Sequence, residues 1–211
     1  MQKQANPVKL NFHFDPLCPL AWRTALWIRE ARKVRPIDVQ WRFFSLEMVN
    51  RKEGVTPDFQ KDLSWPALRT LAYLRDHEGN EAVERLYVAL GNAAHGQKQD
   101  IKDVAVIQEV AQKAGFDGSI VAKALSDNST KEAIITDHEE ARSRYAAFGV
   151  PTIAIEGSNL GYYGPVIQEV PQGEDAGEFW DYTAYALRQP NIFELKRDRS
   201  QGSWGPVSAV K

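Results

Sequence analysis

The sequence predicts an α/β protein in which a block of helices interrupts a frame built from strands and helices. Three observations lead to this prediction. Residues 9–44 read as strand, helix and strand, residues 57–148 are rich in helix-forming residues, and strand patterns return after residue 149. A chain of 211 residues, 43% of them hydrophobic, can form one domain or one domain with an insertion.

The first part of the frame is predicted from alternating hydrophobicity. Lys9–Phe14 and Asp38–Phe44 each place aromatic and aliphatic residues at every second position, which is typical of strands. Between them, apolar residues recur from Trp22 onward with helical spacing. A strand, a helix and a strand in this order favour a parallel pair of strands. His13 lies between two phenylalanines, and we expect it to point outward.

The middle of the chain is predicted to hold about five helices, separated by glycines, over residues 57–148. Thr56-Pro57-Asp58 and Ser64-Trp65-Pro66 have the composition of helix starts. A helical stripe runs through Lys102–Ala114, and the last helix is expected over Thr130–Phe148.

The second part of the frame is predicted to contain two strands and a closing helix. Strand patterns cover Thr152–Glu156 and the region around Tyr162–Val166, and Gly173–Leu187 reads as a helix with acids near its start. We expect the tail after this helix to be irregular and to pack through Phe193 and Trp204.

Composition excludes several classes of partner and cofactor. The 26 Lys and Arg residues against 28 Asp and Glu leave a net charge of −2, so neither nucleic acid nor an anionic membrane is expected as a partner. No apolar leader or long apolar run is seen, and we expect a cytoplasmic protein. One cysteine cannot form an internal disulfide, and the four histidines lack the spacing of metal ligands, so no metal is expected.

The single cysteine, Cys18, falls between the first strand and the first helix. A thiol in the first turn of a helix faces unpaired backbone N–H groups and the positive end of the helix dipole, which predicts a lowered pKa. Pro19 suits the first helical position. The alternative is a small hydrophobic core residue, the usual state of a free cysteine, but the position favours a working thiol. Asp15 is expected to form the turn, and Trp22 to lie in the core.

Three segments carry a family resemblance, in this order: Phe14–Pro19 (FDPLCP), Gly149–Ile153 (GVPTI) and Phe193–Arg197 (FELKR), with the helical block between the first two. Together they resemble the DsbA-like branch of the thioredoxin superfamily, and within it the actinobacterial mycothiol-dependent nitroreductase and mycoredoxin-like proteins. The resemblance implies a thioredoxin fold with a large helical insertion. The implied thioredoxin-like domain is residues 1–56 and 149–211, and the implied insertion domain is residues 57–148.

The resemblance also implies roles for individual residues. Cys18 would be the attacking thiol, and Pro151 a cis-proline facing it, although only about 5 to 6% of X-Pro bonds in folded proteins are cis. The implied substrate-binding residues are Pro19, Leu20, Trp22, Val150, Pro151, Asn92 and His95. His95 could serve as an acid or base near neutral pH. Its alternative role is to bond the carbonyl groups at a helix end.

One departure from the family pattern affects the mechanism. Ala21 stands where relatives carry the second cysteine of Cys-x-x-Cys. A dithiol enzyme releases itself from a mixed disulfide by internal attack, so this chain would need an outside thiol. Mycothiol or a similar low-molecular-weight thiol is the implied cosubstrate, and no tightly bound cofactor is expected.

Three function classes follow. The first is a monothiol thiol-disulfide oxidoreductase that acts on a disulfide or electrophilic substrate with a small thiol. The second is an activity like that of kappa-class glutathione transferases or isomerases, which use a bound small thiol. The third is a non-catalytic binding protein. The identity of the thiol and substrate, pairing into a homodimer, and whether the missing cysteine abolishes or redirects activity stay open.

Overall fold

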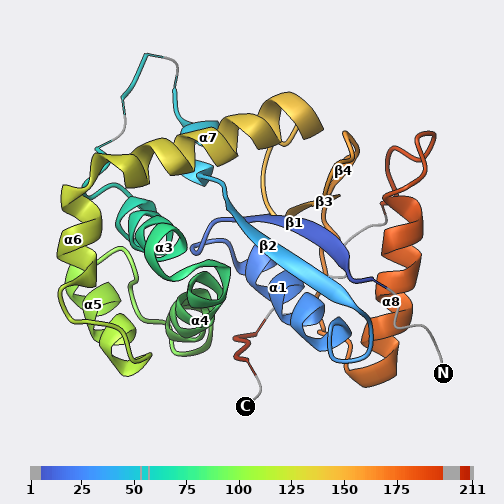
Figure 1. Cartoon of the computed structure of the whole chain (residues 1–211), viewed down its shortest axis with the longest axis horizontal. Coiled ribbons are helices and arrows are strands. Elements are labelled where there is room, and N and C mark those ends of the chain that lie inside the picture. The colour runs from blue at the N-terminus through green and yellow to red at the C-terminus, as the bar shows by residue number, and fades with distance from the viewer. Residues whose placement is uncertain (1–5, 53, 57, 197–204, 210–211) are drawn as a thin grey trace.

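The computed structural model describes residues 6–196 and 205–209, apart from residues 53 and 57. Its centre is a four-stranded sheet in the order β2-β1-β3-β4 (Figure 1). The strands are β1 (Val8–Phe14), β2 (Ile37–Phe43), β3 (Thr152–Ile155) and β4 (Gly161–Tyr163). β1 and β2 are parallel, whereas β3 is antiparallel to both β1 and β4. The predicted parallel pair and the two later strands are therefore confirmed.

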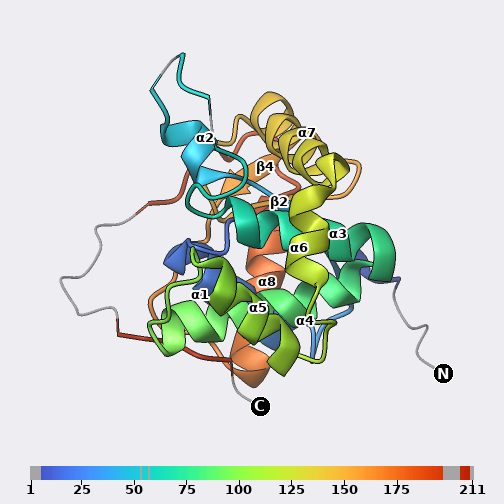
Figure 2. The same ribbon diagram turned by 90° about the vertical axis from the view of Figure 1, so that its left-hand side faces the viewer.

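The helices also follow the predicted order. They are α1 (Pro19–Ala31), α2 (Leu46–Asn50), α3 (Trp65–Glu78), α4 (Asn80–Gly91), α5 (Val104–Lys113), α6 (Ile120–Ser126), α7 (Asn128–Tyr145) and α8 (Gly173–Ala186), with a π-helical turn η1 (Asn92–Gly96). The five α-helices from α3 to α7 form the block inserted between β2 and β3, which faces the viewer in Figure 2. The short α2 was not predicted.

Of the two helix starts predicted for the beginning of the block, only the second is found. Ser64 precedes Trp65, the first residue of α3, and Pro66 lies in its first turn, as predicted. The helix start predicted at Thr56-Pro57-Asp58 is wrong, because Thr56 and Asp58 lie in irregular chain, while Pro57 falls outside the described residues.

Helices cover both faces of the sheet. On one face, Phe14 of β1 packs against Tyr87 of α4, with ring centroids 4.0 Å apart. On the other face, His13 contacts Tyr145 of α7 at 5.7 Å, and Figure 1 shows α7 lying across that side. His13 is 1% exposed, so the expectation that it points outward is wrong. The reason is that α7 covers the face that an alternating pattern alone assigns to solvent.

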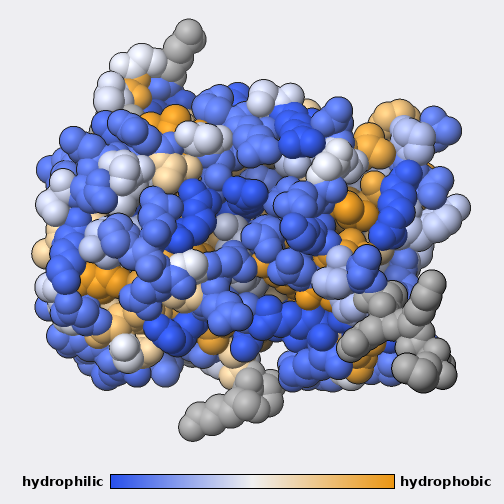
Figure 3. All heavy atoms as spheres, viewed as in Figure 1, coloured by the Kyte–Doolittle hydropathy of each residue, from blue (hydrophilic) through white to orange (hydrophobic). Residues whose placement is uncertain are grey.

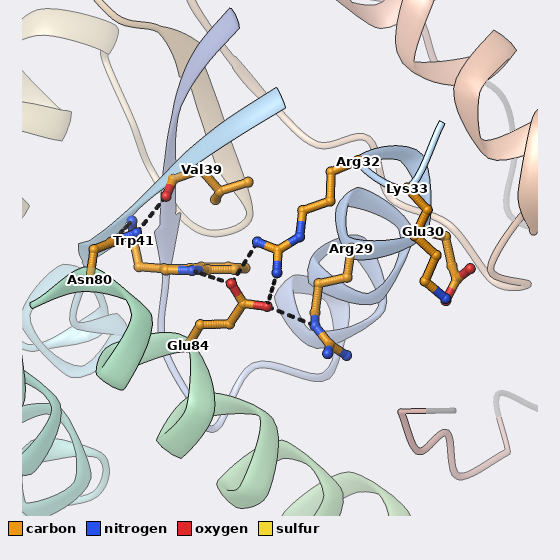
Figure 4. A network of polar contacts seen from close by, with 8 residues as sticks. All are labelled: Arg29, Glu30, Arg32, Lys33, Val39, Trp41, Asn80 and Glu84. Atoms are coloured by element: carbon orange, nitrogen blue, oxygen red, sulfur yellow. Dashed lines mark hydrogen bonds and ion pairs between the residues drawn. The ribbon is translucent and has the colours of Figure 1, made fainter. Parts of the chain in front are cut away.

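The helical block is fixed to the free edge of β2 by a side-chain amide. Asn80, the first residue of α4, accepts a hydrogen bond from the Trp41 backbone N–H at 3.0 Å and donates one to the Val39 carbonyl at 2.7 Å (Figure 4). An edge strand otherwise leaves these backbone groups without a partner strand. The amide of Asn80 therefore takes the place of a neighbouring strand at this edge.

A half-buried carboxylate ties the same helix to α1. Glu84 accepts hydrogen bonds from Arg29 at 2.9 Å and Arg32 at 2.6 Å, and its side chain is 14% exposed (Figure 4). The indole N–H of Trp41 donates to the same carboxylate at 3.4 Å. Bidentate pairs between arginine and a carboxylate fix orientation as well as distance. α1, β2 and α4 are thus held in one arrangement, and α1 is the helix that begins at Cys18.

The visible surface is mostly hydrophilic, with small separated hydrophobic patches (Figure 3). Phe193 is 84% exposed, so the expectation that it packs onto the protein is wrong; Trp204 lies outside the described residues. Among the helices of the described ranges, none is long and apolar enough to cross a membrane.

Two buried histidines lie on the α7 side of the sheet. His13 and His138 are 1% and 0% exposed, and the Nδ1 atom of His138 accepts a hydrogen bond from the Ser45 N–H at 3.2 Å. Burial lowers the pKa of each from its ordinary 6.5 to about 4, because the charged ring would lose its hydration.

This burial predicts loss of stability in mild acid. In the unfolded chain both histidines take up protons as the pH falls below about 6.5, whereas in the folded chain they stay neutral down to about pH 4. The free energy of unfolding should therefore fall through this window by roughly 3 kcal/mol for each histidine. Urea denaturation of wild type, His13→Gln and His138→Gln at pH 7 and pH 4.5 measures it.

The exposed His77 provides the matched control. His77→Gln should keep the full pH dependence of the wild type, and each buried variant should lose part of it. Equal pH dependence in all four proteins would contradict the prediction.

Candidate active site

Cys18 occupies the residue immediately before α1. Its backbone is extended, with φ of −82° and ψ of 111°, and Pro19 is the first residue of the helix. The Ala21 N–H donates to Cys18 Sγ at 3.4 Å, and the Trp22 N–H donates to the Cys18 carbonyl at 3.0 Å. Cys18 therefore caps the helix, and its sulfur bonds one of the N–H groups that a helix start leaves unpaired.

The loop before β3 closes over the other side of the sulfur. The Val150–Pro151 peptide bond is cis. Cys18 Sγ donates a hydrogen bond to the Val150 carbonyl at 3.3 Å, across 132 residues of sequence. The thiol thus lies between a backbone donor from α1 and a backbone acceptor from the cis-proline loop.

The environment of the sulfur favours the thiol over the thiolate. Cys18 is 5% exposed, and burial raises its pKa above the ordinary value. Hydrogen bonds from the Ala21 and Leu20 N–H groups oppose this, and the charge of Asp15 adds to it. The lowered pKa predicted from the helix start is therefore wrong for this structure. Two amide hydrogen bonds do not replace the hydration that a thiolate loses on burial.

Asp15 holds the loop that carries Cys18. Its carboxylate is 1% exposed and accepts from the Leu17 N–H at 2.9 Å, the Leu46 N–H at 2.9 Å and the Ser64 hydroxyl at 2.8 Å. The bond to Leu17 confirms the predicted turn. The other two bonds connect the end of β1 to the starts of α2 and α3, which the sequence did not predict. Burial raises the pKa of Asp15, and these hydrogen bonds oppose that rise.

Trp22 and His95 form a stacked pair beside the loop. Their rings lie 6.2 Å apart at 28°, and Trp22 is 1% exposed, as expected for a core residue. His95 Nε2 donates to the Pro16 carbonyl at 2.9 Å, so its partner is a carbonyl of the Cys18 loop rather than of its own helix end. Burial lowers the pKa of His95, which favours the neutral ring.

A segment near the C-terminus covers this pair. We call residues 205–209 the strap. The Trp22 indole N–H donates to the Val207 carbonyl at 2.7 Å, and the Ala209 N–H donates to Asn92 Oδ1 at 2.6 Å. The sequence indicated an irregular tail here, and no pattern in it indicated where the tail would lie.

The other predicted binding residues differ in access to solvent. Pro19 is exposed and Leu20 is half-buried, so both lie at the rim above the sulfur, whereas Val150 is 2% exposed. Beside the cis-proline loop, the exposed ring of Phe148 packs against the ring of Tyr163, with centroids 4.7 Å apart and planes at 31°. This aromatic pair was missed, although Phe148 stands three residues before Pro151. No cluster of metal-ligating side chains occurs within the described ranges.

The fold and the site define a class: a DsbA-like protein of thioredoxin fold with a helical insertion. A probable DsbA oxidoreductase from Streptomyces coelicolor has a TM-score of 0.62 at 19% identity, covering 95% of this chain and 98% of that one. The cytosolic disulfide reductase DsbM from Pseudomonas aeruginosa, solved with GSH, has a TM-score of 0.59 at 15% identity, covering 84% and 100%. A 2-hydroxychromene-2-carboxylate isomerase has a TM-score of 0.59 at 18% identity, covering 84% and 94%.

Within this class, the chain belongs to the Rv2466c-like family, described as mycothiol-dependent nitroreductase Rv2466c, whose model matches residues 17–197. It is also 34% identical over 193 residues to the uncharacterized protein Rv2286c of Mycobacterium tuberculosis, covering 90% of this chain and 82% of that protein. The family supports an enzyme of the oxidoreductase type.

Removing the Asp15 carboxylate should destabilise the protein. Asp15→Ala leaves three donors, of Leu17, Leu46 and Ser64, without their acceptor, and we expect the free energy of unfolding to fall by roughly 2 to 4 kcal/mol. Asp100→Ala is the control, since Asp100 has a side chain that is 61% exposed and should change stability by less than about 0.5 kcal/mol. Guanidinium denaturation of both variants measures the difference, and equal effects would contradict the assigned role of Asp15.

The raised pKa of Cys18 predicts a pH profile for its alkylation. In the native protein, the midpoint of the iodoacetamide rate against pH should lie above the midpoint for the thiol in urea-unfolded protein, which is expected at about pH 8.5. Intact-mass kinetics across pH 6 to 10 provide the measurement. A native plateau below about pH 8 would show that the thiolate is stabilised instead.

Proposed function

We propose that this protein is a monothiol thiol-disulfide oxidoreductase in which Cys18 exchanges disulfides with a low-molecular-weight thiol, mycothiol or a similar compound. The observation that carries the proposal is the placement of Cys18 Sγ, which lies 3.4 Å from the Ala21 N–H and 3.3 Å from the Val150 carbonyl. Both groups belong to the backbone, one from a helix start and one from the cis-proline loop. They support reaction of the sulfur with a substrate that approaches along this loop.

The proposed cycle has two exchanges. Cys18 first loses its proton to water, and the thiolate attacks one sulfur of a substrate disulfide. A bond forms between Cys18 and that sulfur, the substrate S–S bond breaks, and the second sulfur leaves as a thiolate that takes a proton from water. The thiolate of a small thiol then attacks the mixed disulfide and releases Cys18. The first small thiol is now joined to the substrate half by a disulfide, which a second small thiol attacks. The products are the fully reduced substrate and one disulfide of the two small thiols.

The chain itself explains the need for an outside thiol. Ala21 occupies the position from which a second cysteine would attack the mixed disulfide, and it is fully buried. No other cysteine exists in the 211 residues. A reducing compartment such as the cytoplasm would keep Cys18 free and supply the second thiol.

Residues around the sulfur suit two different ligands. The exposed Phe148–Tyr163 pair and the rim residues Pro19 and Leu20 suit an apolar or aromatic substrate beside the cis-proline loop. On the other side, Asn92 offers a carboxamide and Trp22 an indole N–H. These polar groups suit a small thiol that carries amide and hydroxyl groups, so the residues present fit mycothiol as a cosubstrate.

A second candidate function is favoured by the state of the thiol. The raised pKa keeps the proton on Cys18, and the sulfur donates its hydrogen to the Val150 carbonyl. A thiol in this state could instead donate a hydrogen bond to the thiolate of a bound small thiol, as a transferase or isomerase requires. In that case, Cys18→Ser should keep much of a conjugation activity, whereas disulfide exchange should be lost.

Mixed-disulfide formation tests the first candidate. Incubation with oxidised glutathione should add one glutathione to the wild type, and Cys18→Ser should add none. Ala21→Cys restores a Cys-x-x-Cys motif, so its new thiol should displace glutathione and leave an internal disulfide. Intact-mass spectrometry distinguishes these products.

Two results would count against the proposal. Wild-type protein that forms no adduct at Cys18 with any small disulfide would exclude exchange. An adduct that persists in Ala21→Cys as fully as in wild type would show that residue 21 does not face the mixed disulfide, and the monothiol explanation would then be wrong.

A further inference from the structure

The strap lies across the residues that would hold a small thiol. The Val207 N–H donates to the His95 carbonyl at 3.3 Å, in addition to the bonds already described from Trp22 to Val207 and from Ala209 to Asn92. Figures 1 and 2 show the red C-terminal segment beside α1 and the helical block. Every one of these bonds uses the backbone of the strap. The surface beneath therefore recognises an extended amide chain rather than a particular side chain.

The bonded groups form a matched set. The indole N–H of Trp22 offers one donor, and Asn92 Oδ1 and the His95 carbonyl offer two acceptors. They meet one carbonyl and two N–H groups of the strap. A peptide-like small molecule presents the same pattern of carbonyl and N–H groups.

The residues that bond the strap also contact the Cys18 loop, both before and after the cysteine. Trp22 follows Cys18 by one helical turn and bonds its carbonyl at 3.0 Å. His95 bonds the carbonyl of Pro16, two residues before the cysteine, at 2.9 Å. A ligand whose sulfur reaches Cys18 while its amides reach Trp22 and Asn92 would therefore occupy the position of the strap.

The fit of the strap against η1 is close. A side chain at Gly96 would place its Cβ 2.0 Å from the hydroxyl oxygen of Ser208 and 3.3 Å from the Cβ of Ser208. A larger residue at this position would force the Ser208 side chain to move. The strap is thus seated in the protein surface.

The strap also forms one wall of a cavity of about 350 Å³ over α1. Its residues 205–208 line this cavity together with Arg23 and Leu26 of α1 and the loop at Gln168. The Arg23 guanidinium donates to the carbonyls of both Gly205 and Gln168, which joins the strap to that loop. Movement of the strap would remove this wall of the cavity.

We call the surface formed by Trp22, Asn92 and His95 the small-thiol groove. We propose that the strap occupies this groove when no ligand is bound, and that the ligands of the groove are thiols or disulfides that carry amide groups. The strap must leave before such a ligand binds. This inference rests on the proposed function, because it takes Cys18 as the reacting group. It adds the chemical class of the ligand and a means by which the chain restricts its own reaction.

The test compares two disulfides on the full chain. Val207→Pro with Ala209→Pro removes both N–H donors of the strap without changing a residue of the groove. The rate of adduct formation at Cys18 with oxidised glutathione, which carries amides, should rise about five-fold or more. The rate with 2-hydroxyethyl disulfide, which has no amides, should change by less than about two-fold. Ser208→Pro is the matched control, since the Ser208 N–H makes no hydrogen bond to any residue that the structure describes.

Hydrogen exchange of the wild type provides a second measurement that needs no variant. Saturating S-methylglutathione, which cannot react with Cys18, should increase amide exchange in residues 205–209. Unchanged exchange there would overturn the proposal, and so would an unchanged rate with oxidised glutathione in the double variant. If neither disulfide forms an adduct in any protein, the proposed function itself fails, so the two failures are distinguishable.

Discussion

The hydrogen bonds of the buried Asp15 carboxylate are the constraint on which the rest of the site depends. One bond shapes the turn before Cys18, and the other two reach the start of α2 and the residue before α3. A carboxylate with so little access to water is stable only when its oxygens are paired in this way. The frame and the helical block therefore share one polar centre directly behind the cysteine.

Local patterns predicted the framework well, because hydrophobic residues recur every two residues in a strand and every three to four residues in a helix. The alternation in Lys9–Phe14 matches β1, and the helical stripe in Lys102–Ala114 matches α5 to within two residues at either end. The position of Cys18 before α1 was also visible, since Pro19 marks a helix start. The family resemblance supplied the cis bond before Pro151, which the residues alone made improbable.

Properties that depend on distant segments could not be predicted in the same way. The thiol pKa was expected to fall because the helix start was visible, but the Val150 loop that buries the sulfur lies 132 residues away. His13 was expected at the surface because no residue near it in the sequence indicates that α7 covers its face of the sheet. The strap was missed because backbone hydrogen bonds impose almost no requirement on the residues that make them.

The hydrogen bond from residue 21 to the sulfur determines what a substitution at that residue changes. It comes from the main chain, so it is present whether the side chain there is a methyl group or a thiol. Exchanging cysteine for alanine at this position therefore removes the thiol that would attack a mixed disulfide, and it leaves the hydrogen bond to the first sulfur in place. The same scaffold is therefore suited to chemistry with one cysteine and to chemistry with two.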